Sequence, residues 1–305
     1  MIKGLAITPP IIGRISIGRV VERNGQRLPA KDDQFTLTGQ VQTKDGWVLH
    51  PLDEQLRKEQ DTDKLRRIPV RLPFSCADLN LRAEYSMFDR QTGRPVCVGN
   101  GVTCRRMTAE GLQELECPGS GLCEFGKNGQ CKLYGRMTVQ VGDDNQDLSC
   151  FILRTTSFNT IRSLFARMLY YSAVSGGLLH CMPLQLKLRG KSTTMSHRTA
   201  IYYVDLELMD GLTLTDAVTQ AKITQTERES AGIDQDALDN VASLGFANGQ
   251  FEYSEEELPE ILEEFYPATS DDTSQTTEPD VRQQKVHKLK SRLKPTAAAR
   301  GTLQA

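Results

Sequence analysis

Residues 97–131 have the sequence CVGNGVTCRRMTAEGLQELECPGSGLCEFGKNGQC and contain five of the eight cysteines of the chain. Glycines surround these cysteines, and large apolar side chains are few. A segment of this composition cannot bury enough apolar surface to hold one conformation by packing alone. Zinc bound by thiolates would supply the missing free energy, because binding a structural metal contributes directly to folding. We therefore predict that this stretch is a metal-bound insert in a larger domain.

The spacing of the five cysteines leaves 6, 12, 5 and 7 residues between successive pairs. This is looser than the short CxxC spacing of common zinc fingers. Four thiolates fill a tetrahedral shell, so the predicted zinc site is structural, because a catalytic zinc keeps one position open. The alternative is a group of reduced cysteines without a metal. The expected ligands are Cys104, Cys117, Cys123 and Cys131, with Cys97 as the alternative to Cys104.

The remaining cysteines, Cys76, Cys150 and Cys181, lie on strand-like segments, and we predict that they are small core residues. The chain has no apolar run of about 18 residues, so no membrane helix is expected. The apolar patches near the N-terminus are interrupted by two prolines and Arg14, unlike the continuous core of a signal peptide. We expect a cytoplasmic protein, and in a reducing compartment clustered cysteines bind metal more often than they form disulfides.

Alternation of apolar and polar residues dominates the first 230 positions and predicts many strands. The strand-like segments are residues 12–27, 35–50, 66–74, 80–106, 132–142, 150–157, 182–189 and 199–209. Hairpin turns are expected at Asn24-Gly25 and Asp45-Gly46, and at residues 91–93. We expect the second arm of the last hairpin to carry both Cys97 and Cys104. Pro69 should confine its strand to a sheet edge, because proline cannot donate to a ladder.

Residues 157–174 form the clearest predicted helix. Ser157 can cap it, and apolar residues recur at steps of three and four from Ile161 onward. Gly176 and Gly177 follow, as a left-handed C-terminal cap requires. A further helix is expected over residues 213–230.

These patterns predict a strand-rich α+β domain over residues 1–230, including the cysteine insert at 97–131 and one main helix. From residue 231 the composition changes, and we predict a mostly disordered tail to residue 305. Residues 252–280 contain eleven acidic and no basic residues, whereas residues 281–305 contain seven basic and no acidic ones. The alternatives for residues 254–266 are an amphipathic helix that docks on a basic partner, or a shield that mimics DNA and folds back on the tail.

Positive charge in the body of the chain is concentrated after the insert. Residues 1–251 are nearly neutral overall, which argues against a strongly basic, duplex-binding body. The cations after the insert are interleaved with aromatic residues, a pattern that suits nucleic acid or a partner protein; the alternative is an ordinary solvated sheet face. The residues of this predicted surface are Lys132, Arg136, Arg154, Arg162, Arg167, Lys187, Arg189 and Lys191.

Catalytic motifs are not evident. The four histidines do not have the HExxH spacing of a zinc hydrolase, and the serines lack the context of a nucleophile elbow. Gly190-Lys191-Ser192 ends like a phosphate loop but lacks the upstream glycine, so a hairpin tip is the better interpretation. We therefore do not expect an enzyme, and a metal-dependent hydrolase is the least favoured function.

The order of features between residues 104 and 189 resembles the recombination directionality factor-like family of phages and mobile elements. That family is typified by the factor that redirects a large serine integrase. The similarity covers about a third of the chain, and Phe158 stands where tryptophan is expected. The residues that carry it, besides the cysteines, are Thr155, Thr156, Ser157, Phe158, Ile161, Gly176, Gly177, Leu178, Pro183, Leu184 and Leu186.

The resemblance implies an accessory factor that binds an integrase on its attachment sites and favours excision over integration. It also implies a metal held by the cysteines. The resemblance leaves open whether the factor contacts DNA itself or only through the integrase. A second hypothesis is a zinc-containing protein that binds single-stranded nucleic acid during replication or repair of mobile DNA.

Overall fold

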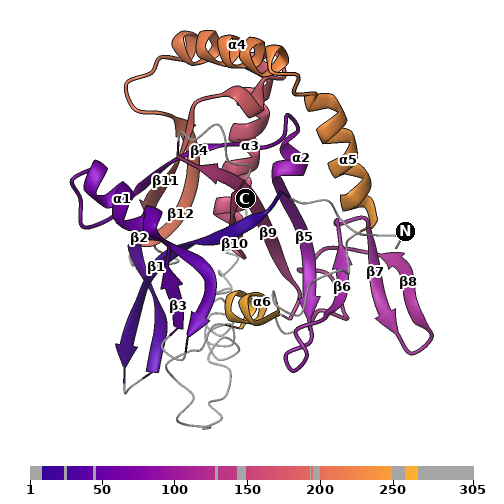
Figure 1. The fold of residues 1–305 in the computed structure, drawn as a ribbon. Coiled ribbons are helices and arrows are strands. Elements are labelled where there is room, and N and C mark those ends of the chain that lie inside the picture. Colours follow the sequence, from indigo (N-terminus) through magenta and orange to yellow (C-terminus); the bar gives the residue numbers. More distant parts are fainter. Residues whose placement is uncertain are drawn as a thin grey trace, which may run out of the picture. The chain divides into compact units, whose positions relative to one another are not determined.

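The computed structural model describes residues 9–23, 26–43, 46–127, 130–142, 149–192, 194, 200–248 and 258–266. All of them fall in one compact unit, Met1–Pro267, and the basic end of the chain lies outside the described residues. The strand-rich α+β class is confirmed (Figure 1). None of the helices in these ranges is long and apolar enough to cross a bilayer.

Twelve strands form one sheet with two branches. The main branch has the order β3-β2-β1-β10-β9-β5-β6-β7-β8, and β9 also pairs with β4, which continues through β11 to β12. The strands are β1 Ile11–Arg23, β2 Gln26–Thr43, β3 Gly46–Leu49, β4 Arg67–Arg71, β5 Leu81–Phe88, β6 Pro95–Gly99, β7 Thr103–Thr108, β8 Gly111–Glu116, β9 Lys132–Val141, β10 Cys150–Thr155, β11 Leu184–Lys191 and β12 Ile201–Leu208. The helices are α1 Pro51–Glu59, α2 Ala77–Asn80, α3 Phe158–Ser175, α4 Leu214–Ser230, α5 Gln235–Asn248 and α6 Leu258–Phe265, with a 3-10 turn at Leu179–Cys181.

Strand β4 corrects one prediction. It lies between β11 and β9 and pairs with both, so the prediction that Pro69 confines it to an edge is wrong. The pairing with β9 begins only at Val70, and the carbonyl of Pro69 accepts a hydrogen bond from Gly142 N at 3.2 Å. Proline is tolerated here because the ladder with β9 ends at this residue and needs no donor from it.

The strands that carry the cysteines differ from the prediction as well. Cys97 lies on β6, but Cys104 lies on a separate strand, β7, so one hairpin arm does not carry both. Gly101 stands between them with a φ of 95°, a conformation that suits glycine and reverses the chain. The resulting meander of β6, β7 and β8 places Gly99 opposite Cys104 in register.

Helix α3 begins and ends as its sequence predicts. The Ser157 hydroxyl accepts a hydrogen bond from Thr160 N, and Gly176 closes the helix with a φ of 70°. Its apolar stripe is buried against the sheet, where Ile161 lies over Gly135 of β9. A Cβ at Gly135 would lie 2.7 Å from Ile161 Cγ1, so glycine permits this close approach of helix and strand.

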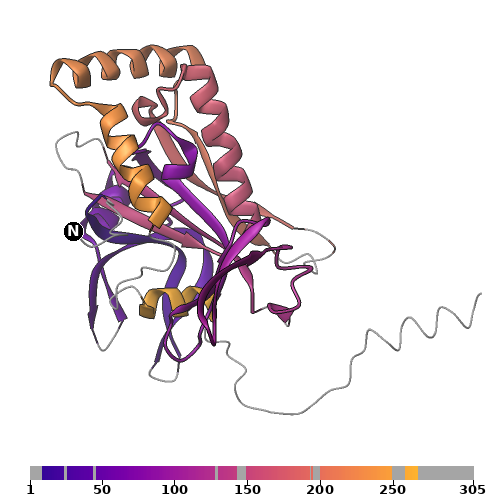
Figure 2. The same cartoon turned by 90° about the vertical axis from the view of Figure 1, so that its right-hand side faces the viewer.

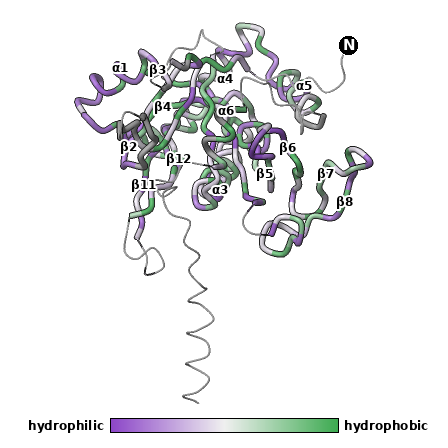
Figure 3. The backbone as a smooth tube through the Cα atoms, turned by 90° about the horizontal axis from the view of Figure 1, so that it is seen from below, coloured by the Kyte–Doolittle hydropathy of each residue, from purple (hydrophilic) through white to green (hydrophobic). Residues whose placement is uncertain are grey.

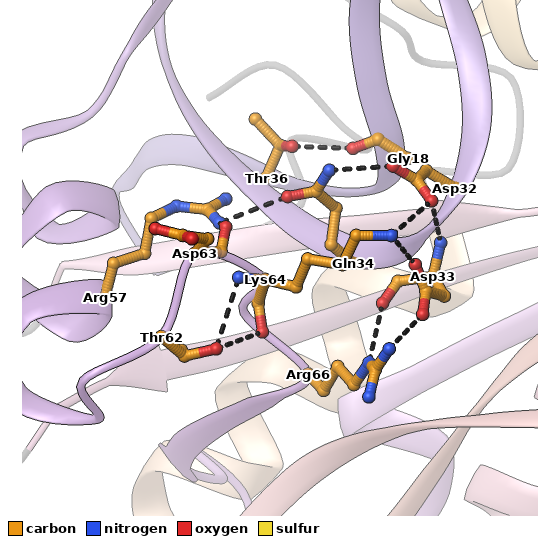
Figure 4. Close-up of polar contacts among 10 residues, drawn as sticks. All are labelled: Gly18, Asp32, Asp33, Gln34, Thr36, Arg57, Thr62, Asp63, Lys64 and Arg66. Atoms are coloured by element: carbon orange, nitrogen blue, oxygen red, sulfur yellow. Dashed lines mark hydrogen bonds and ion pairs between the residues drawn. The ribbon is translucent and has the colours of Figure 1, made fainter.

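A polar network attaches α1 and the segment after it to β2 (Figure 4). Arg57 donates to Gln34 Oε1 at 3.1 Å and to the carbonyl of Asp63 at 2.6 Å. Lys64 forms ion pairs with Asp32 and Asp33 on β2. These contacts fix the course of the chain just before β4, and therefore the position of the second branch.

The further helix expected over residues 213–230 is confirmed as α4, and α5 extends beyond residue 230, where the composition predicts a disordered tail. α4 lies beside the C-terminal end of α3, and its Gln225 contacts His180 of the 3-10 turn (Figure 2). α5 follows, and its Asp239 contacts Ser75 before α2.

The acidic segment forms α6, which packs on β5 and β9. Phe265 is buried between Phe88 and Tyr134, with ring centroids 4.6 Å and 5.4 Å away. Tyr266 donates from its hydroxyl to the carbonyl of Phe88 at 2.7 Å, and Lys132 donates to the carbonyl of Phe265. The amphipathic-helix alternative therefore describes this part of the segment, and its docking surface lies within the chain itself.

Candidate cysteine centre and basic surfaces

Three of the five insert cysteines form a buried cluster. Cys97 on β6, Cys104 on β7 and Cys117 after β8 pack together, with Tyr85 and Met87 of β5 beside them. The meander produces this contact, because β6 and β7 are neighbouring strands and Cys117 N bonds back to the carbonyl of Val102. Cys97, predicted as an alternative ligand, thus lies with Cys104 and Cys117.

Cys123 and Cys131 lie beside this cluster in the glycine-rich loop. Nη2 of Arg106 lies 4.0 Å from Cys104 Sγ and 3.9 Å from Cys123 Sγ, so one guanidinium joins the loop to the strands. A Cβ at Gly99 would lie 2.7 Å from Cys117 Sγ. Glycine at this position therefore permits the sulfur to approach the backbone.

The protonation of these thiols follows from their environment. Burial, followed by the interaction with neighbouring Cys97, raises the pKa of Cys104 to about 11. Burial likewise raises the pKa of Cys131 to about 12, with the charges of the other four insert cysteines adding to the effect. All five sulfurs are therefore close enough to influence one another. The raised pKa values keep Cys104 and Cys131 as neutral thiols, and a bound divalent cation would favour their thiolate form.

The donor chemistry suits zinc, but the side-chain positions do not form a finished site. Across the described ranges, no group of three or more His, Cys, Asp or Glu side chains is arranged to hold a metal ion. The five thiols, the glycines between them and the nearby guanidinium are the features that fit a thiolate-bound metal. Zinc therefore stays a prediction here.

The other three cysteines divide between core and surface. Cys150 and Cys181 are buried, as predicted. Cys76 is exposed, so its assignment to the core is wrong. It is the N-cap residue of α2, after the loop that follows β4.

The cations predicted as one surface lie on two. Gly135 faces α3, so its neighbour Arg136 faces the opposite side of the sheet, because strand side chains alternate. Arg154 and Arg82 are the register partners of Arg136 on the flanking strands and share that face. Lys132 is on the same face and contacts α6. The remaining five predicted cations lie on α3 and β11.

The surface on α3 and β11 is partly neutralised by β12. Arg189 forms ion pairs with Asp205 at 2.7 Å and with Glu207 at 2.9 Å. Lys187 also pairs with Glu207, at 2.6 Å, and Arg167 pairs with Asp205 at 3.2 Å. Arg162 and Lys191 extend this group of cations.

The motif residues of the resemblance form the connection from β10 through α3 to β11. Thr155 ends β10, and its hydroxyl accepts a hydrogen bond from Ser157 N at 3.1 Å. Gly176 and Gly177 both have positive φ, and the carbonyl of Pro183 accepts from Met209 N at 3.1 Å. Most of the motif is therefore structural, whereas Phe158 is 61% exposed on the first turn of α3.

Sequence reasoning missed Arg106 and the apolar surface of the insert. The position of Arg106, two residues after Cys104 on one strand, could have indicated that both side chains share a face. The exposed apolar residues are Val102, Met107, Leu112, Leu115, Leu122 and Phe125. They lie in turns and at separate positions along β7 and β8, so no continuous stretch of the sequence is apolar.

Comparison with known proteins gives one family. Residues 12–209 match the model of the Gp3-like family, described as recombination directionality factor-like. No curated protein and no solved structure matches the chain. The matched range runs from β1 through the cysteine insert and α3 to the end of β12. The family description indicates an accessory role in DNA recombination of phages or mobile elements, in contact with a recombinase. Because the match covers well over half of the chain, this protein belongs to the Gp3-like, recombination directionality factor-like family.

Proposed function

We propose that this protein binds a serine recombinase on its DNA and sets the direction of recombination without catalysing strand exchange. The observation that carries the proposal is the family match over residues 12–209, which spans the twelve-stranded sheet, the cysteine insert and α3. A factor of this kind needs a rigid surface that the recombinase can recognise. The cysteine insert offers one.

The outer end of the sheet presents apolar side chains to solvent. β7 and β8 end the main branch of the sheet (Figure 3). Leu122 is 80% exposed in the loop after them, and Val102, Met107 and Phe125 are also exposed. Several large apolar side chains exposed in one region of a protein commonly mark a protein interaction site. We assign this insert surface, defined by these four residues, to the recombinase.

Zinc would stabilise this surface. Cys104, Cys117, Cys123 and Cys131, with Cys97 beside them, would hold the ion, and Arg106 would balance part of the negative charge of the thiolates. A structural zinc cross-links its ligands and supplies no catalysis when its shell is complete. The insert would then present its exposed side chains in one fixed arrangement.

The test of the proposed function uses the recombinase encoded in the same mobile element. We expect the full chain to bind the recombinase–DNA complex, to stimulate excision and to inhibit integration in a purified recombination assay. Leu122→Asp should weaken binding to the recombinase at least tenfold, because a carboxylate would be buried in an apolar contact.

Ile223→Asp is the matched control, because Ile223 is 56% exposed on α4, outside the family match. It should bind and act like the unchanged protein. Absence of any effect of the unchanged protein on either reaction would refute the proposed function. An equal loss in both variants would refute the assignment of the insert surface.

A role in binding single-stranded nucleic acid is the second candidate, and the cations on α3 and β11 favour it. The two functions differ in their affinity for bare oligonucleotides. Nanomolar, strongly salt-dependent binding to single strands without any recombinase would support the second candidate over the first.

A further inference from the structure

A cavity of about 260 Å³ lies between α3 and the β11–β12 hairpin. None of its lining residues belongs to the cysteine insert, so the cavity is separate from the insert surface. It lies about four turns of α3 away from the glycines that end the helix. Its polar lining consists of Asn159, Arg162, Ser163, Arg167, Lys191 and Tyr203. The cavity is thus lined by three cations, two hydroxyl-bearing residues and an amide.

The cations of this cavity differ in how they are engaged. Among the described residues, Arg162 has no hydrogen-bond or ion-pair partner, and it is exposed. Lys191 donates to Asn159 Oδ1 at 2.6 Å, an amide that leaves its charge uncompensated. Arg167 uses Nε for Asp205. Among the described residues, the terminal nitrogens of Arg167 have no hydrogen-bond partner, and this residue lines the cavity.

The charges around the cavity leave an excess of positive charge. The carboxylates of Asp205 and Glu207 are shared among Arg189, Lys187 and Arg167. Arg162 and Lys191 have no carboxylate partner among the described residues. Bringing an anion between them would therefore relieve the repulsion of like charges and satisfy donors that now face solvent.

We propose that this cavity binds a backbone phosphate of the DNA on which the recombinase acts. Guanidinium, ammonium and hydroxyl groups are the usual donors to phosphate oxygens, and the hollow is large enough for a phosphate with its sugar. Phe158 lies one helical turn before Arg162 on the same face of α3, and its exposed ring can cover the sugar. The identity of the polyanion as DNA rests on the proposed function.

The experiment measures binding of the full chain to a duplex oligonucleotide that carries the recombinase site, at low salt and without recombinase. We expect weak binding, and the double variant Arg162→Gln with Lys191→Gln should lower the affinity about tenfold. The slope of log affinity against log salt should fall by about one, because the cavity neutralises one phosphate.

The matched control, Lys58→Gln with Lys222→Gln, removes the same charge from exposed positions on α1 and α4 and should leave the slope unchanged. Equal losses in both double variants would overturn the proposal, because binding would then follow net charge alone. Unchanged DNA binding in the cavity variant would overturn it too.

A third arm separates this site from the proposed function. Binding to the recombinase without DNA is measured for the cavity variant, and it should match the unchanged protein. If that binding is lost, the cavity takes an acidic protein surface and the DNA assignment is wrong. The DNA affinity of the cavity variant does not affect the recombinase binding measured for Leu122→Asp. The two experiments therefore test the two proposals separately.

Discussion

At the scale of single residues, His180 shows how burial sets a protonation state. Its Nε2 lies 2.8 Å from Gln225 Oε1, and Gln225 donates from Nε2 to Glu229 at 2.7 Å, which fixes the orientation of the amide. His180 therefore donates from Nε2, and its Nδ1 is buried without a hydrogen-bond partner in the part of the chain that the structure describes. Protonating Nδ1 would bury an unsatisfied charge, so burial lowers the pKa of His180 below its ordinary value.

This environment predicts a pH dependence of stability. The unfolded chain binds a proton at His180 below about pH 6.5, whereas the folded chain does so only at lower pH. The unfolded state thus binds more protons, and the free energy of unfolding falls as the pH drops from about 7 toward 5. His180→Gln keeps a donor for Gln225 and cannot titrate.

The measurement is the melting temperature at pH 7.5 and pH 5.5. The unchanged protein should lose a few degrees more than His180→Gln over this range. His50, whose pKa burial also lowers, should leave a residual decrease in both. A decrease of the same size in the two proteins would show that His180 does not contribute.

At the scale of elements, the cysteine insert combines a buried group of sulfurs with an exposed apolar surface. We expect the two to belong together, because a glycine-rich loop loses much conformational entropy when its exposed side chains are held in place. The Cys104 and Cys131 thiols, whose pKa values burial raises, would be stabilised as thiolates by a bound cation.

Removal of two thiols tests this element. We expect the purified protein to contain about one zinc per chain. Cys117→Ser with Cys123→Ser should abolish the zinc content and increase amide hydrogen exchange throughout residues 97–131. Cys76→Ser alters an exposed cysteine outside the insert and should keep both properties. Full zinc content in the double variant would contradict the ligand assignment.

At the scale of the whole molecule, local patterns predicted most elements but not their arrangement. The strands and α3 follow from alternation, capping and helical period, which depend on neighbouring residues. The parallel pairing of β1 with β10 joins segments more than a hundred residues apart, and no local pattern specifies it. For the same reason the sequence could not show that Arg136 and Arg162 lie on different surfaces.

The candidate sites were predictable to a similar extent. The cysteines were identifiable from their density, whereas the cavity depends on contacts between α3 and β12 that only the fold creates. Helix α6 was only an alternative interpretation of its region, because eleven acidic residues dominate it, although Leu258, Ile261, Leu262 and Phe265 recur at helical spacing. The acidic composition of the region predicted disorder, whereas the spacing of its apolar residues indicated the helix.

The docking of α6 can be tested through its central side chain. Phe265→Ala removes a fully buried ring, a change that commonly costs about 3–5 kcal/mol in a core. The helix can detach instead of leaving a cavity, so we expect faster hydrogen exchange in α6 with little change in the melting temperature. Phe158→Ala, on an exposed ring, should leave exchange in α6 unchanged. Persistent protection of α6 in Phe265→Ala would show that other contacts hold it.

The contact of α6 with β5 and β9 has a practical consequence for shortened versions of this protein. A fragment trimmed to the family match would end at residue 209 and would lack α6 altogether. Phe88 and Tyr134 would then lose the aromatic ring that covers them. Such a fragment would expose an aromatic patch beside the cysteine insert, and this patch would promote self-association. In a pull-down experiment, that self-association could be mistaken for binding to a partner. Expression boundaries should therefore include Tyr266.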